Sequence, residues 1–170
     1  RDKNKKIVGY WKAIEKAACA AVTTGKSQRV GVIRFFVKDI WLFCELPSGR
    51  CLAYPYPEVH PKMTPWGEPT EELSFMGMWK NKWLRETTYG GKLVENITQA
   101  VSRDIMVTGM QNAERDGFPI VMTVHDEVIS DTPFGDDLEE FIRALIRLPR
   151  WAQGLPINAE GFRSERYVKR

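Results

Sequence analysis

The chain has 170 residues, of which 43% are hydrophobic and 28% are charged, and this ordinary globular composition excludes a disordered protein. Its net charge of +3 permits a nucleic-acid partner without indicating one, and its three cysteines lack the spacing of a zinc site or a disulfide framework. No apolar run approaches the ~20 residues that cross a bilayer, and the N-terminus lacks a signal-peptide core, so we expect a cytoplasmic protein without a membrane partner.

Residues 1–28 are expected to form an amphipathic helix that ends near Gly25. The apolar residues recur at helical spacing: Ile7, Trp11, Ile14 and Ala18. The segment around Gly25, Lys26 and Ser27 resembles a relaxed nucleotide-binding P-loop. A P-loop ends a strand and opens a helix, so that backbone N–H groups point at the phosphates. Here a helix precedes Gly25 and strand-like sequence follows it, so we do not predict nucleotide binding at this place.

Residues 29–54 carry short runs of β-branched and aromatic side chains, broken at Lys38-Asp39 and again at 47–50. This pattern predicts three strands in a meander. Residues 55–72 contain five prolines and Gly67. Because proline fixes φ and lacks an N–H donor, we predict a surface excursion without regular structure there.

Residues 73–85 mix aromatic with basic side chains. The members of this pattern are Phe75, Trp79, Lys80, Lys82, Trp83 and Arg85. Such a mixture can bind nucleic acid by base stacking and phosphate contact. A helix or extended arm whose aromatic side chains pack while its lysines are solvated is the commoner arrangement, and we favour it here.

Residues 91–115 predict a long helix with two opposite faces. One face is apolar and comprises Val94, Ile97, Val101, Ile105 and Thr108. The opposite face, which we call the donor stripe, comprises Lys92, Asn96, Gln99 and Arg103. Amide and guanidinium donors suit the DNA minor groove, where every base pair presents N3 or O2 acceptors, so this face can contact a duplex without reading its sequence.

Residues 120–131 place two β-branched runs on either side of His125, Asp126 and Glu127. The runs predict a β-hairpin with the three polar residues at its tip. Two carboxylates and an imidazole at such a bend suit a binding site, but aspartate is also common in ordinary solvated turns, so the triplet alone leaves both readings open. A further helix is expected over 136–148.

The segment 88–104, followed by Thr123-Val124-His125-Asp126-Glu127, resembles the C-terminal part of family A DNA polymerases, especially their phage-like branch. The ending at 151–157, with Glu160-Gly161 and Tyr167, is similar to the terminal segment of that branch. The resemblance covers nearly the whole chain. It implies an α+β fold in which a small antiparallel palm sheet, including the hairpin, packs against long helices. Residues 1–28 would then end the fingers region, and 73–170 would form the C-terminal palm portion.

The resemblance implies a role for each candidate residue. Asp126 matches the aspartate that holds catalytic Mg²⁺ in a two-metal site, Glu127 its acidic neighbour, and His125 the residue near the primer end. Gln99 matches a glutamine that donates to the minor groove. A bacterial member of the family would have Asn where Glu95 stands and Arg near Gly91. The neighbouring Asn96 and Lys92 would substitute for these two residues.

The implied activity is template-directed nucleotidyl transfer in a bacterial or phage-infected cell. The primer 3′ oxygen would attack the α-phosphate of a deoxynucleoside triphosphate, with a primer-template DNA duplex held along the donor stripe by Gln99 and Arg103. The family's first metal-binding aspartate and nucleotide-binding fingers helix are not found in these 170 residues, so we expect the isolated chain to be inactive. The alternatives are a nucleic-acid-binding module that lost catalysis and a structural remnant. The sequence does not indicate an oligomeric state.

Overall fold

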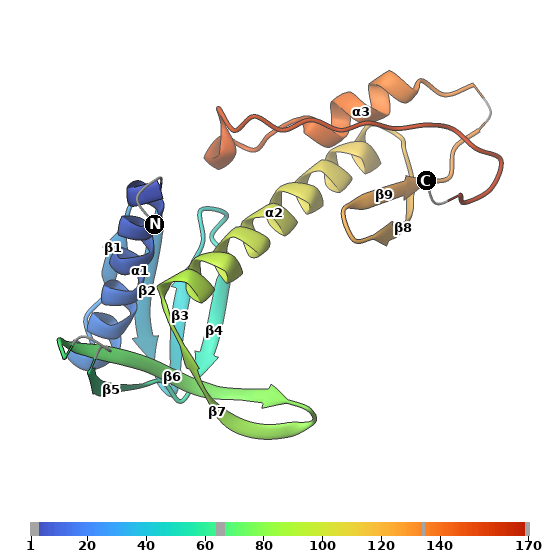
Figure 1. Ribbon diagram of the computed structural model, residues 1–170. Coiled ribbons are helices and arrows are strands. Elements are labelled where there is room, and N and C mark those ends of the chain that lie inside the picture. Colours follow the sequence, from blue (N-terminus) through green and yellow to red (C-terminus); the bar gives the residue numbers. More distant parts are fainter. Residues whose placement is uncertain (1–3, 64–66, 134, 169–170) are drawn as a thin grey trace. The chain divides into compact units, whose positions relative to one another are not determined.

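The computed structural model describes residues 4–63, 67–133 and 135–168. The chain divides into two compact units, 1–101 and 102–170, and each is described here by itself. Helices and antiparallel sheets alternate along the chain, which confirms the α+β class (Figure 1). Among the described residues, no helix combines the length and the apolar character needed to span a bilayer.

Helix α1 (Lys5–Thr24) confirms the first predicted helix. It ends at Gly25, whose φ of +66° is a left-handed cap that glycine adopts without a steric penalty. The predicted apolar face is buried only in its later part, at Ile14 and Ala18, while Ile7 and Trp11 stay exposed. The reason is that small side chains bring this part of the helix close to the sheet: Ala17, Ala18, Cys19 and Ala21 are all buried.

The first sheet is a meander, as the sequence predicts, with one additional short strand. Its strands are β1 (Gln28–Val30), β2 (Ile33–Lys38), β3 (Trp41–Glu45) and β4 (Cys51–Pro55), antiparallel and in chain order. Strand β1 follows α1 directly. A helix therefore precedes the Gly25 segment and a strand follows it, which is the reverse of a P-loop.

The second sheet corrects the prediction that 55–72 lacks regular structure. Its strands are β5 (Glu58–Met63), β6 (Pro69–Trp79) and β7 (Lys82–Thr88), in the order β5-β6-β7. Pro61 lies in the outer strand β5 opposite Glu71, and Pro69 is the first residue of β6. At both positions a strand tolerates the missing N–H group, so the prolines are compatible with the sheet. Pro65 lies outside the described residues.

Residues 73–85 form most of the β6–β7 hairpin, so the extended form of the prediction holds and the helical form is wrong. Phe75 packs on the core, with its ring centroid 4.9 Å from that of Tyr54 in an edge-on arrangement. Trp83 is exposed and does not pack as the favoured reading requires. The side chain of Trp79 lies outside the described set.

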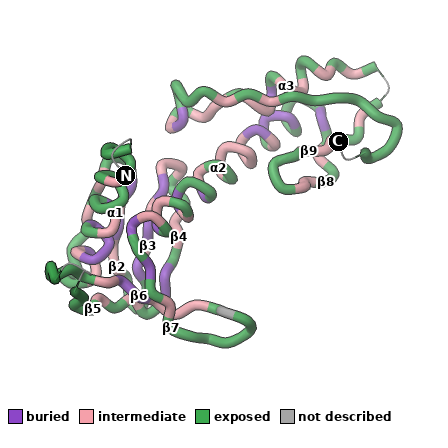
Figure 2. The backbone as a smooth tube through the Cα atoms, viewed as in Figure 1, coloured by how far each residue is buried: buried purple, intermediate pink, exposed green. Residues whose placement is uncertain are grey.

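The core of the first unit lies between α1, the first sheet, β6 and the start of helix α2 (Gly90–Arg115), as the buried segments in Figure 2 show. Its largest fully buried side chains are Phe35, Ile14, Ile33, Leu42, Leu73 and Leu93. Gly90 allows a close backbone approach, because a Cβ there would lie 2.1 Å from the carbonyl oxygen of Trp11. A side chain at position 90 would therefore push α2 away from α1.

The second unit has a smaller core, where the end of α2 meets helix α3 (Leu138–Ile146) and the hairpin of β8 (Ile120–Val124) and β9 (Glu127–Ser130). Its buried residues are Ala113, Phe118 and Ala144, with Ile120, Phe141 and Leu145 packed against them. Helix α3 confirms the helix predicted within 136–148, and its N-terminus is capped by Asp137, which accepts a hydrogen bond from the Glu139 N–H (2.9 Å). In the described part of the chain, β8 and β9 pair only with each other.

Candidate active site and nucleic-acid interface

The hairpin holds His125 and Asp126 as the two central residues of its turn. Val124 and Glu127 are paired across the strands, so Glu127 begins β9 and does not lie in the bend itself. His125 has a φ of +54° and Asp126 does not have a positive φ, which is the pattern of a type II′ turn that normally places glycine first. A non-glycine residue in this region costs on the order of 1 kcal/mol, and such residues cluster at functional sites.

All three residues of the triplet are exposed to solvent. The C-terminal segment reaches the hairpin, because the Tyr167 hydroxyl lies 3.5 Å from Oε2 of Glu127 and donates to it. Among the described residues, no three or more His, Cys, Asp or Glu side chains gather in a group that could hold a metal ion. No local pattern predicts the contact between Tyr167 and Glu127, since the two residues are 40 positions apart.

The donor stripe of α2 is exposed at Lys92, Gln99 and Arg103. Glu95 lies between two of these residues and binds both. Its carboxylate is 3.1 Å from Nζ of Lys92, and it accepts a hydrogen bond from Nε2 of Gln99 at 3.3 Å. Exposed ion pairs of this kind contribute about 0–1 kcal/mol, so these donors can exchange Glu95 for another acceptor at small cost.

Asn96 does not belong to the exposed face. It is half-buried, and its Nδ2 donates to the Tyr54 hydroxyl at 3.4 Å. The helical repeat explains this position, because Leu93 and Ala100, three residues before and four after it, are both buried. Burial raises the pKa of Tyr54 to about 12, so the hydroxyl that Asn96 contacts is neutral. The donor stripe is therefore narrower than predicted.

The apolar face of α2 follows the prediction more closely. Ile97 is buried in the core of the first unit, and Val94 and Val101 pack against it. In the first unit the helix thus presents Lys92 and Gln99 to solvent because its other face packs on the core. In the second unit Arg103 is exposed, and its Nη1 lies 3.4 Å from the sulfur of Met106.

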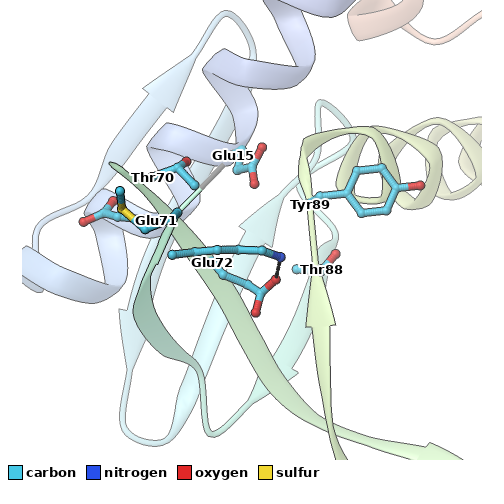
Figure 3. Close-up of a pocket in the computed structure, with 8 residues that line it drawn as sticks. Glu15, Thr70, Glu71, Glu72, Thr88 and Tyr89 are labelled. Atoms are coloured by element: carbon cyan, nitrogen blue, oxygen red, sulfur yellow. Dashed lines mark hydrogen bonds and ion pairs between the residues drawn. The ribbon is translucent and has the colours of Figure 1, made fainter. Parts of the chain in front are cut away.

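A cavity of about 190 Å³ opens between α1 and the second sheet, in the first unit (Figure 3). Its lining residues are Glu15, Lys62, Met63, Thr70, Glu71, Glu72, Thr88 and Tyr89. The lining carries three glutamates and one lysine, and Lys62 pairs with Glu72. The remaining negative charge disfavours a nucleotide phosphate. The Thr88 hydroxyl is buried and has no partner within the described residues. None of the residues predicted to form a site lines this cavity.

The chain is similar to part of a DNA polymerase of Bacillus phage SP02. The two sequences are 40% identical over an alignment of 172 residues, which includes 99% of this chain and 26% of that polymerase. The chain therefore spans about a quarter of the length of the relative it matches. No family model matches the chain, and no solved structure matches it.

Proposed function

We propose that this chain forms the C-terminal palm and fingers portion of a family A DNA polymerase, and that the whole polymerase catalyses template-directed nucleotidyl transfer. The observation that carries the proposal is the exposed turn at His125 and Asp126, in a chain 40% identical to a quarter of a phage DNA polymerase. An imidazole and a carboxylate held at a strained turn have no packing role there, which favours a chemical one.

In this proposal Asp126 supplies one carboxylate to Mg²⁺, which binds oxygen ligands of this class. Glu127 is the accessory acid beside it, and His125 lies near the primer end. A two-metal centre needs carboxylates from more than one element. The described residues bring no such group together, so this chain does not by itself fit a complete magnesium site. We expect the isolated chain to give only background primer extension.

The proposed role of α2 is to support the primer-template duplex through the minor groove. Gln99 and Arg103 would donate to N3 and O2 acceptors, and Gln99 would exchange its bond to Glu95 for one to DNA. Lys92 adds a cation on the same face. Asn96 contributes less in this proposal, because its amide already donates to Tyr54.

A chimera tests the catalytic part of the proposal. The chain would replace the aligned quarter of the SP02 phage polymerase, and primer extension would be measured with Mg²⁺ and all four deoxynucleoside triphosphates. Asp126→Asn keeps the side-chain size and removes the charge that attracts a cation, so extension should fall by orders of magnitude. Asp131→Asn, which changes an exposed carboxylate just after β9, is the matched control and should extend like the unmodified chimera.

Two results of this experiment would contradict the proposal. Near-parental extension by the Asp126→Asn chimera would remove the metal role from Asp126. A folded chimera that binds duplex DNA but does not extend a primer would favour the alternative of a non-catalytic nucleic-acid-binding module.

The duplex role is tested by binding in the same chimera. Gln99→Ala and Arg103→Ala should each weaken duplex binding about fivefold, since one hydrogen bond contributes about 1 kcal/mol. Thr98→Ala changes an exposed residue beside Gln99 and should leave the affinity unchanged. Loss of thermal stability with unchanged affinity would show that the stripe has a structural role.

A further inference from the structure

The β6–β7 hairpin extends beyond the part of the sheet that packs on the core. At its base, Leu73 and Thr88 are opposite each other and both are buried. At its far end, Trp79 and Lys82 pair across a two-residue turn formed by Lys80 and Asn81. Figure 1 shows this looped end projecting from the rest of the first unit, and Figure 2 shows it as exposed.

Large apolar side chains gather at this exposed end. Met78 is 64% exposed, Trp83 51% and Leu84 44%. Met78 and Trp83 are directly opposite each other in the ladder, so their side chains share one face of the hairpin. Exposed apolar side chains that lie together mark an interaction surface, since leaving them in water costs free energy. Lys82 and Leu84, on either side of Trp83 in β7, lie on the other face. We call Met78, Trp83 and Leu84, with the turn residue Lys80 and the strand residue Lys82, the arm tip.

The charge of the arm tip indicates the kind of partner. Residues 76–84 contain two lysines and no carboxylate, so the arm tip itself carries a positive net charge. The turn itself is strained, because Lys80 and Asn81 have φ values of +47° and +61°, where asparagine and glycine are the usual pair. A lysine in this conformation costs free energy, and residues of this kind cluster at sites that contact ligands.

We propose that the arm tip binds single-stranded DNA, with a base stacked on Trp83 and phosphates contacting the lysines. Bases in a duplex already stack on each other, so an exposed tryptophan face suits an unpaired strand. The lysines complement a strand's phosphates, and stacking on an indole is independent of base sequence. The choice of DNA as the ligand rests on the proposed polymerase function. The stacking role of Trp83 is independent of that function.

The test uses the 170-residue protein and a fluorescein-labelled 12-nucleotide strand of mixed sequence, with binding measured by fluorescence anisotropy at several salt concentrations. Trp83→Ala should weaken binding at least about fivefold, and Trp83→Phe should retain most of it because a phenyl ring still stacks. Lys82→Ala should reduce the slope of log affinity against log salt by about 0.7, as loss of one phosphate contact on a single strand requires. Trp41→Ala, at an exposed tryptophan of β3, is the control and should bind like the parent.

The proposal is overturned if the parent does not bind the strand, or if Trp83→Ala binds as the parent does at unchanged melting temperature. Equal weakening by Trp41→Ala would also overturn it. Binding to anionic phosphatidylglycerol vesicles that depends on Trp83, without strand binding, would assign the arm tip to a membrane surface instead. Tighter binding of the RNA strand of the same sequence would overturn the choice of DNA.

This readout is independent of catalysis. Failure of the Asp126→Asn chimera test with intact Trp83 dependence would remove the polymerase proposal and leave the arm tip as a nucleic-acid-binding surface. If Asp126→Asn abolishes extension in the chimera and Trp83→Ala leaves strand binding unchanged, the arm-tip proposal is removed and the polymerase proposal stands.

Discussion

Thr88 carries a hydroxyl that is buried beside the acidic cavity without a partner in the described part of the chain. A buried unpaired hydroxyl costs about 1–3 kcal/mol of desolvation. Thr88→Val replaces it with a methyl group of similar size in a strand that favours β-branched residues, so the melting temperature should rise. Thr88→Ala is the control, because it removes the hydroxyl but leaves a void and should give no gain. A lower melting temperature for Thr88→Val would contradict the assignment of the hydroxyl as unpaired.

Asp126 should show opposite effects on stability and on function. In the isolated chain, Asp126→Asn removes one of two adjacent carboxylates, so repulsion from Glu127 falls and thermal melting should be unchanged or slightly higher. In the chimera the same change should abolish most primer extension. A residue retained for chemistry against local stability gives this pair of results, whereas an ordinary turn residue gives neither. A clear drop in the melting temperature would indicate a structural role for Asp126.

For single residues, the sequence predicts those features that depend on neighbours along the chain. The turn at His125 and Asp126 follows from the flanking β-branched runs. The half-burial of Asn96 does not, because it depends on Tyr54, which belongs to a strand 42 residues earlier. The contact from Tyr167 to Glu127 is of the same kind. Partners that are distant in the sequence leave no local pattern.

Gly109 shows why α2 can lie against the end of α3. A Cβ at position 109 would lie 2.4 Å from the carbonyl oxygen of Leu145, a backbone atom that cannot move aside alone. Gly109→Ala should therefore destabilise the second unit by about 1–3 kcal/mol, although alanine is the better helix former.

Gly9 provides the matched control for this prediction. It lies in α1, and a Cβ there would meet no atom within 4 Å. Gly9→Ala should stabilise the protein by up to about 1 kcal/mol. Urea unfolding of both variants, followed by circular dichroism, measures the difference. Equal stabilisation by the two substitutions would show that α2 and α3 are not in close contact at Gly109.

Among the elements, the helices were predictable and the second sheet was not. The periodicity of apolar residues predicts α2 nearly to its ends, because its first half packs one face, from Leu93 to Val101, on the core of the first unit. Strand β5 was missed because the rule against proline applies to central strands, and β5 lies at an edge. Edge position is a property of the sheet and cannot be read from the segment.

The core of the first unit should make the whole protein sensitive to alkaline pH. Burial raises the pKa of Cys19 to about 11 and of Cys44 to about 12, from an ordinary value of 9.0. The folded state therefore favours the neutral thiols. Their contribution to stability is complete below pH 9 and is lost as the pH rises through the folded values, so the melting temperature should fall progressively between about pH 9 and 12.

A substitution separates this effect from general alkaline unfolding. Cys44→Val keeps an apolar side chain of similar size in the sheet and removes the ionisable group, so its melting temperature should fall less steeply over this pH range. The same slope for parent and variant would show that other groups, such as Tyr54, dominate the alkaline transition.

The division into two units could not be predicted, because it falls inside α2, between Val101 and Ser102. A boundary is usually indicated by glycine, proline or a flexible linker, and neither glycine nor proline lies next to Val101 or Ser102 in this helix. The similarity to a phage DNA polymerase, in contrast, was visible from short motifs in order along the chain, and the 40% identity supports that part of the prediction. The family, the metal and the site residues stay predictions.

Pro61 has a consequence for the behaviour of the protein at high concentration. It lies within β5, at the outer edge of the second sheet, and it pairs on its inner side with Glu71. An open strand edge is a template on which a strand from another copy can add, and this is a route to aggregation. Pro61 has no N–H group to offer to an added strand, and the polar side chains of His60 and Lys62 flank it, each within reach of a glutamate. The residue that disfavours a strand in the sequence thus protects the folded strand from being extended by a second copy.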